Sequence, residues 1–181
     1  MKICGIDYSL TSPAICVHEG NEFSYSNCKF YFLTSVKKNA TVFDGRIQGE
    51  FMDDYIHECE RYDIISNWAM NIIKRCDKIA IEGYAYGASG KVFHIAENTG
   101  LLKYKIWNNG KPLEIVTPSH VKKLATGKGN ADKRGMYDAF VKETAVDLQK
   151  IISPNKKDIG SPVADIIDSY FICKVLFKQI L

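Results

Sequence analysis

Four acidic residues stand where their side chains could hold divalent metal ions together. They are Asp7, Glu82, Asp165 and Asp168. Four carboxylates brought together repel one another unless cations lie between them, and hard oxygen ligands of this kind suit Mg²⁺ or Mn²⁺. Two such ions about 4 Å apart can hold the attacking water and the departing oxygen of a phosphodiester in line. These residue types therefore indicate a two-metal hydrolytic site.

Two short apolar strands each end in one of these acids. Residues 2–7 form a β-prone run that ends at Asp7, and residues 78–82 repeat the design and end at Glu82. The helical segment between them is long enough to return the chain in parallel, so both carboxyl ends should lie at one edge of a sheet, where ligands of open α/β sheets bind. Alone, Asp7 is explained equally well as a cap of the following turn. The repeated design favours the metal site.

The other two acids lie in the last helix, which should begin at Ser161 and Pro162 and run to the end of the chain. Asp165 and Asp168 are three residues apart and therefore share one face of that helix. Acids in the first turns of a helix are also explained by the helix dipole, and alone that explanation would be preferred. Because two strands also end in acids, a site shared by all four acids is the preferred explanation.

The remaining elements should complete an RNase H-like α/β fold in one domain, residues 1–181. Residues 14–18 and 23–32 should join the first strand in three antiparallel strands, and residues 35–49 should form a polar loop. We expect a helix over 51–75, broken near Asp63, and another over 92–107. A strand over 113–116 and helices opening at Pro118 and Ala131 should follow. The prediction is a mixed five-stranded sheet, three strands antiparallel and then two parallel, with helices on both faces.

A glycine-broken basic loop precedes the helix that opens at Ala131. Lys128, Lys133 and Arg134 lie beside this helix start, whose backbone amides favour anions, so the segment is suited to contact backbone phosphates. A solvated surface loop is the open alternative. Gly90 and Lys91 do not form a phosphate-binding P-loop, because an alanine and a valine occupy its other defining positions.

Composition and charge fit an intracellular globular protein. The 181 residues are 46% hydrophobic and 25% charged, and the net charge is +3. Six cysteines without a C-x-x-C pair are typical of free thiols in a reducing compartment. We find no secretory signal and no segment apolar enough to span a bilayer. We expect a cytoplasmic location, in a bacterium or a virus-infected host, with an organelle or the nucleus as the open alternative, and no membrane partner.

The chain resembles the RuvC family of Holliday junction resolvases, particularly its phage-type members. Most of the chain takes part in the resemblance, apart from residues 36–58. Its carriers are Gly5-Ile6-Asp7 with the turn Ser9-Leu10-Thr11, Ile81-Glu82, Pro118-Ser119-His120-Val121-Lys122, the segment from Gly127 to Lys133, and Ala164-Asp165-Ile166-Ile167-Asp168.

The resemblance implies a role for each matching residue. Asp7, Glu82, Asp165 and Asp168 would be ligands of two Mg²⁺ or Mn²⁺ ions, with no other small-molecule cofactor. Lys122 and Lys133 would support catalysis through the DNA phosphates. Tyr84 or Tyr86 would stack on bases near the crossover. We place Lys91, Lys128 and Arg134 among the DNA-contacting residues, and we expect a homodimer, because symmetric resolution needs two active sites.

The expected function is metal-dependent cleavage of four-way DNA junctions by paired symmetric nicks that leave 5′-phosphate and 3′-hydroxyl ends. A broader nuclease of the same fold, cutting flaps, loops or RNA–DNA hybrids, is the first alternative. A branched-DNA-binding protein without cleavage is the second. An actin-like kinase domain also begins with a strand-end aspartate, but that fold requires two such domains and glycine-rich phosphate loops, and this chain is too short for them.

Overall fold

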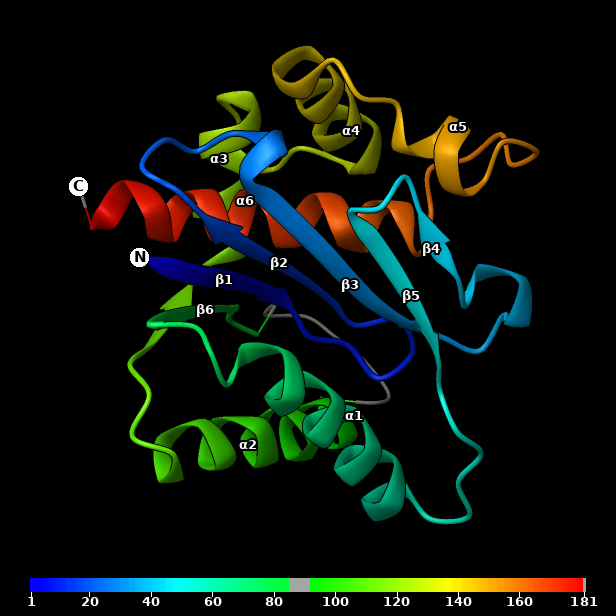
Figure 1. Ribbon diagram of the computed structural model, residues 1–181, viewed down its shortest axis with the longest axis vertical. Coiled ribbons are helices and arrows are strands. Elements are labelled where there is room, and N and C mark those ends of the chain that lie inside the picture. The colour runs from blue at the N-terminus through cyan, green and yellow to red at the C-terminus, as the bar shows by residue number, and fades with distance from the viewer. Residues whose placement is uncertain (85–91, 181) are drawn as a thin grey trace.

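A computed structural model describes residues 1–84 and 92–180 of the chain (Figure 1). A seven-stranded sheet, in the order β4-β5-β3-β2-β1-β6-β7, forms the middle layer. The strands are β1 Lys2–Asp7, β2 Ala14–Glu19, β3 Cys28–Thr34, β4 Val42–Phe43, β5 Ile47–Phe51, β6 Lys78–Glu82 and β7 Leu113–Val116.

Helices cover both faces of the sheet (Figure 1). On one face lie α1 (Glu58–Ile73) and α2 (Val92–Asn108). On the other face lie α6 and, farther out, the three remaining helices. Their bounds are α3 Pro118–Thr126, α4 Lys133–Thr144, α5 Leu148–Ile152 and α6 Val163–Gln179. None of the helices within the described ranges is long and apolar enough to cross a membrane.

The central strand is β1, and its pairing decides where the acids emerge. It runs antiparallel to β2 and parallel to β6, and β6 runs parallel to β7. Ile3, Cys4 and Ile6 of β1 are fully buried, because helices cover both of its faces. The strand therefore delivers its terminal residue, Asp7, from a rigid, buried element.

The most buried helix of the described ranges is α6, which has 17 residues. It is apolar almost all round, and such a helix is stable only when other elements enclose it. It packs against β1 and β2 on one side and against α3 and α4 on the other. Tyr170, Phe171 and Phe140 of α4 pack edge to face in this layer. This packing fixes α6, and with it two of the four acids.

The predicted five-stranded sheet was wrong in its number of strands. The predicted three antiparallel and two parallel strands are present, but residues 35–49, predicted as a loop, contribute β4 and the start of β5. Strand β5 pairs with β3 in parallel and adds a further edge to the sheet. Its inward positions are Ile47 and Gly49, and a Cβ at Gly49 would lie 2.6 Å from the Phe32 ring. The glycine removed the apolar alternation that would have indicated a strand.

Other boundaries also differ from the predictions. The third strand begins at Cys28, because residues 25–27 form a short 3₁₀ turn. The predicted break in the first helix does not occur. Asp63 points outward and accepts hydrogen bonds from Asn67 and Lys105, at 2.9 and 2.7 Å, so its charge is accommodated without interrupting α1. The short helix α5 was not predicted.

Candidate active site

Strand register brings the first two acids to the same edge of the sheet. Ile6 of β1 is the parallel partner of Ile81 of β6, and Asp7 and Glu82 are the next residues on the two strands. Parallel neighbours end side by side, so the two carboxylates leave the sheet together. The sequence-based prediction of a shared strand edge is confirmed.

Helix α6 adds the other two acids through a close approach to β1. A Cβ on Gly5 would lie 2.6 Å from the carbonyl oxygen of Ser169, closer than side-chain atoms ever come. Glycine is therefore required for α6 to lie against the strand at this point. Asp165 and Asp168, in the first two turns of α6, are half-buried on the side nearest the strand ends.

The electrostatics show that the four acids are neighbours. Burial, followed by the charges of Asp165, Asp168 and Glu82, raises the pKa of Asp7 well above its usual value. Burial and then the Asp168 charge raise the pKa of Glu82 to about 7. Burial and then Asp165 raise the pKa of Asp168 to about 6. Each acid is thus held where its ionised form is disfavoured, and nearby positive charge would reverse the effect.

The buried carboxylate of Asp165 gives a further indication that the site can bind a ligand. Burial raises its pKa, partly offset by the neighbouring hydroxyls of Ser161 and Ser12 and by Lys133. Its Oδ2 atom and the Ser12 Oγ atom are buried, and neither has a hydrogen-bond partner in the described part of the chain. A buried carboxylate oxygen without a partner is uncommon, and a ligand for it is the usual explanation.

The donor set fits a hard divalent cation by its chemistry, because all four groups are carboxylates that repel one another. Within residues 1–84 and 92–180, however, no three His, Cys, Asp or Glu side chains are grouped so that they could hold a metal ion as they stand. Coordination of a shared ion would therefore require the carboxylates to turn further toward one another.

Two lysines line a small cavity together with two of the acids. Lys122 of α3 lowers the pKa of Glu82 and of Asp168. Lys133, at the start of α4, lowers the pKa of the three aspartates, which are Asp7, Asp165 and Asp168. The cavity has a volume of about 200 Å³. Both lysines line it together with Glu82 and Asp168, over a floor of Val121, Met136 and Ile167. The site thus places carboxylates and ammonium groups around one cavity.

Helix caps place these lysines. Thr117 caps α3 by accepting from the backbone N–H of His120 at 3.4 Å, and Asp132 caps α4 by accepting from that of Gly135 at 2.8 Å. The predicted helix starts at Pro118 and next to Ala131 are confirmed to within two residues.

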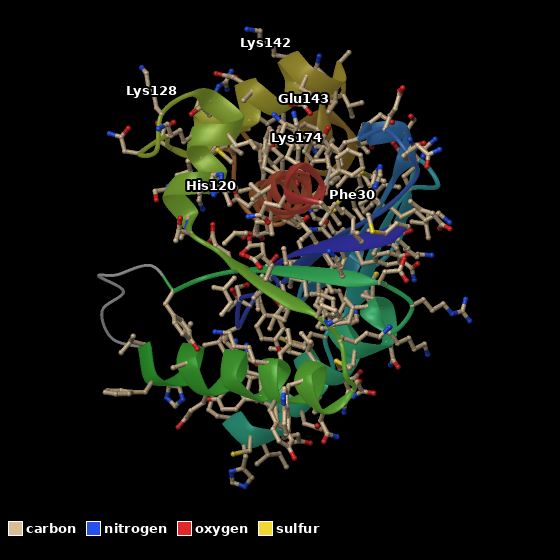
Figure 2. All side chains as sticks on the ribbon, turned by 90° about the vertical axis from the view of Figure 1, so that its left-hand side faces the viewer. Phe30, His120, Lys128, Lys142, Glu143 and Lys174 are labelled. Carbon is tan, nitrogen blue, oxygen red and sulfur yellow. The ribbon has the colours of Figure 1, made fainter. Side chains whose placement is uncertain are left out.

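The other predicted DNA contacts lie farther from the acids. Tyr84 is exposed just after β6, and the ammonium of Lys103 lies 4.6 Å from the centre of its ring. Lys128 is exposed and extends outward from the loop between α3 and α4 (Figure 2). His120 of α3 is exposed as well. Arg134 pairs with Asp138 at 3.0 Å on the exposed side of α4. The predicted residues Tyr86 and Lys91 lie outside the described residues.

A buried arginine that the sequence reading did not single out supports the turn after Asp7. Arg61 of α1 is 5% exposed and donates two hydrogen bonds to the carbonyl oxygen of Leu10, at 3.0 and 2.7 Å. Tyr55 covers its guanidinium, 4.9 Å away, and Glu58 pairs with it at 3.4 Å. The available signal was a charged residue four positions before Ile65, on the apolar stripe of α1.

Comparison with solved structures shows which class of fold this is. Neither a protein-family model nor a curated protein sequence matches the chain. Among solved structures, RuvC of Thermus thermophilus in complex with a Holliday junction substrate matches with a TM-score of 0.65 and 14% identity, over 99% of this chain and 96% of that chain. A second structure of Thermus thermophilus RuvC matches with a TM-score of 0.61 and 15% identity, over 99% of this chain and 96% of that chain.

The Holliday junction resolvase of fowlpox virus also matches. Its TM-score is 0.53 at 13% identity, over 99% of both chains. These likenesses show that the chain has an RNase H-like fold, as the order of its elements predicted. More particularly, its fold is similar to that of RuvC and of the poxvirus resolvase along nearly its whole length.

Proposed function

We propose that this protein is a metal-dependent endonuclease that resolves four-way DNA junctions by paired symmetric nicks. The observation that carries the proposal is the meeting of four electrostatically coupled carboxylates with Lys122 and Lys133 at one sheet edge. Two structures of similar fold, those of Thermus thermophilus RuvC and fowlpox virus resolvase, are described as complexes with Holliday junctions. This similarity supports branched DNA as the substrate.

Asp7, Glu82, Asp165 and Asp168 would hold two Mg²⁺ or Mn²⁺ ions. When bound, such ions activate water and neutralise charge on the departing oxygen of a phosphodiester, which leaves 5′-phosphate and 3′-hydroxyl ends. The chain's own part is to orient the ligands: β1 and β6 are rigid, and Gly5 fixes the distance of α6 from β1. Partial burial of the acids limits competing water and strengthens the attraction between the ionised carboxylates and bound cations.

The two lysines would act on the DNA phosphates. Lys122 and Lys133 already lie close enough to the acids to lower their pKa values, so a phosphate bound over the cavity would lie between acid-bound cations and ammonium groups. Such fixed positive charge stabilises the extra negative charge that develops on phosphate during hydrolysis. Lys128 and Arg134 would contact backbone farther along, and Tyr84 would stack on a base near the branch point.

A homodimer would supply the second active site, and helix α2 carries a surface suited to it. Phe93, Tyr104 and Trp107 are 76%, 59% and 72% exposed and lie on one stripe of α2, whose opposite side packs on α1. Exposed aromatic stripes of this kind mark interaction surfaces. Two α2 helices packed antiparallel about a two-fold axis would bring Phe93 of one copy near Trp107 of the other, which covers both stripes.

The test is cleavage of a labelled synthetic four-way junction beside linear duplex, flap and RNA–DNA hybrid, in Mg²⁺, Mn²⁺ or chelator. Paired symmetric nicks in the junction that chelator abolishes are expected. Equal or better cutting of flap or hybrid would replace the proposal with a broader nuclease. Junction binding without cleavage in any metal would favour a binding protein.

Asp165→Asn is the matched variant for the catalytic role. It keeps the size of the side chain but removes a charge that metal binding needs, so cleavage should fall at least a hundredfold while junction affinity changes less than threefold. Affinity is measured by gel shift in Ca²⁺ or chelator. Retained cleavage, or loss of binding in a folded variant, would contradict this assignment.

A further inference from the structure

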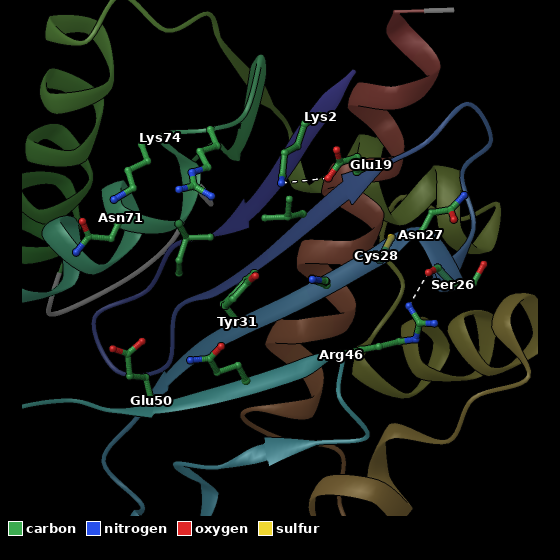
Figure 3. A pocket seen from close by; sticks show the side chains of 15 residues that line it. Lys2, Glu19, Ser26, Asn27, Cys28, Tyr31, Arg46, Glu50, Asn71 and Lys74 are labelled. Atoms are coloured by element: carbon green, nitrogen blue, oxygen red, sulfur yellow. Dashed lines mark hydrogen bonds and ion pairs between the residues drawn. The ribbon is translucent and has the colours of Figure 1, made fainter.

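A groove of about 600 Å³ lies on the α1 face of the sheet, at the far end of β1 from the four acids. Its floor is formed by β3 and β5, and the C-terminal end of α1 forms one wall (Figure 3). Asp7 ends β1, whereas Lys2 at the start of the strand lines the groove. Four residues lie between the two, and five steps along the strand span about 16 Å, so the groove is distinct from the candidate active site.

The groove exists because the helical layer ends before the sheet does. Helices α1 and α2 cover β1 and β6, but β3 and β5 continue beyond them (Figure 1). On β3, Lys29 and Tyr31 point to this open face while Phe30 and Phe32 are buried under α6. Strand β5, absent from the predicted sheet, widens the floor with Gln48, the register partner of Tyr31.

The lining is positively charged. Five cationic residues and two acidic ones line the groove, and the acids are already engaged: Glu19 pairs with Lys2 at 3.1 Å, and Glu50 accepts from the Trp68 indole at 3.1 Å. The other four cationic residues form no ion pair with any residue of the described ranges. They are Lys29, Arg46, Lys74 and Arg75.

An aromatic ring lies among these charges. Tyr31 is half-buried, packs on the core under α1, and lies between Lys74, just after α1, and Arg46 beside β5 (Figure 3). Arg46 is held in place by donating a hydrogen bond to the backbone carbonyl of Ser26. A fixed ring flanked by cations matches what an unpaired nucleotide offers, a flat base and a phosphate on each side.

We propose that this groove binds a single-stranded segment of DNA. Its phosphates would contact Lys29, Lys74, Arg75 and Arg46, and one base would stack on Tyr31. Single-stranded rather than duplex DNA is the ligand, because a ring on the floor of a groove can stack only on a base that is free of its pair. The inference does not depend on the proposed function, since none of the four acids takes part.

The experiment measures binding of a fluorescein-labelled ten-nucleotide oligothymidylate to the full chain by anisotropy, in chelator, at several salt concentrations. Combined Lys29→Gln, Lys74→Gln and Arg75→Gln should weaken binding at least tenfold at low salt. It should also reduce the slope of log affinity against log salt by about 2, because each lost phosphate contact removes about 0.7. Tyr31→Leu should weaken binding at least fivefold at every salt concentration and leave the slope unchanged.

The matched control removes three exposed lysines outside the groove, Lys38→Gln, Lys142→Gln and Lys157→Gln, and therefore changes net charge equally. It should bind within twofold of the native protein. Asp165→Asn should also bind normally, which separates this result from any failure of the cleavage proposal. The inference is overturned if the native chain does not bind the oligonucleotide, if the control loses as much affinity as the groove variant, or if polyglutamate of equal charge competes as well as unlabelled oligothymidylate.

Discussion

Each of the four candidate acids is held where its charged form is disfavoured. Burial is the first cause for all four, and neighbouring carboxylates are the second cause for Asp7, Glu82 and Asp168. A site of this kind favours folding only when a proton or a cation balances the charge. The candidate metal site and the stability of the fold are therefore linked through the same residues.

This linkage predicts how stability depends on pH in the absence of metal. The pKa of Glu82 rises from 4.5 to about 7 on folding, so between these values the folded state binds more protons than the unfolded state. The free energy of unfolding should then fall as pH rises, by up to about 1.4 kcal/mol per pH unit for each such proton. Thermal melting in chelator from pH 5 to 8 should show a shallower decline for Glu82→Gln than for the native chain.

Mg²⁺ or Mn²⁺ should restore the melting temperature of the native chain at pH 8 and should have much less effect on Glu82→Gln. Stability that rises with pH in chelator, or an equal pH dependence in the two proteins, would contradict the linkage.

Arg61 gives a second prediction at the scale of one residue. Arg61→Met keeps the length of the side chain but leaves the Leu10 carbonyl without its two donors, which should cost about 1–3 kcal/mol in the free energy of unfolding. The turn that follows Asp7 should loosen, and cleavage should slow several-fold. Urea unfolding gives the first quantity, with exposed Arg75→Met, in the turn just after the same helix, as the control. Equal losses in the two variants would refute a specific role for Arg61.

At the scale of elements, the contact between β1 and α6 decides whether the acids meet. Gly5→Ala would place a methyl group 2.6 Å from the Ser169 carbonyl oxygen. Helix α6 must then move away from β1, carrying Asp165 and Asp168 with it. We expect a loss of about 1–3 kcal/mol in stability and a larger proportional loss of cleavage. Gly160→Ala, where a Cβ meets nothing within 4 Å, should change neither, and similar results for the two variants would exclude the proposed close-approach role.

Local elements with a clear period could be predicted from the sequence. Strand β7 and the starts of α3 and α4 follow from apolar patterns and caps that lie within a few residues of one another. Strands β4 and β5 could not be predicted, because β5 is stabilised by pairing with β3 and its inward glycine matches no pattern. Whether Asp63 interrupts α1 also depended on a distant residue, Lys105.

At the scale of the whole molecule, the aromatic stripe of α2 predicts dimerisation. Phe93→Lys with Trp107→Lys should give a monomer at concentrations where the native chain is a dimer, because two charges would be buried against apolar partners. Sedimentation measures the oligomeric state, and junction cleavage should change from paired to single, uncoupled nicks. Val42→Lys, at another exposed apolar residue, is the control and should remain dimeric. A dimer that survives the double substitution would place the interface elsewhere.

The sequence by itself determined which residue types form the candidate site and the order of the elements that carry them. The patterns that could be recognised are local: acids at strand ends, two acids on one face of a helix, and capped helices with basic residues. The periodicity of strands and helices allows such patterns to be predicted without a structure. The approach of α6 to β1, the support that Arg61 gives to the turn and the open groove over β3 and β5 were decided only by the tertiary structure. Each depends on residues far apart in the chain, whose contact is set by packing rather than by any local preference.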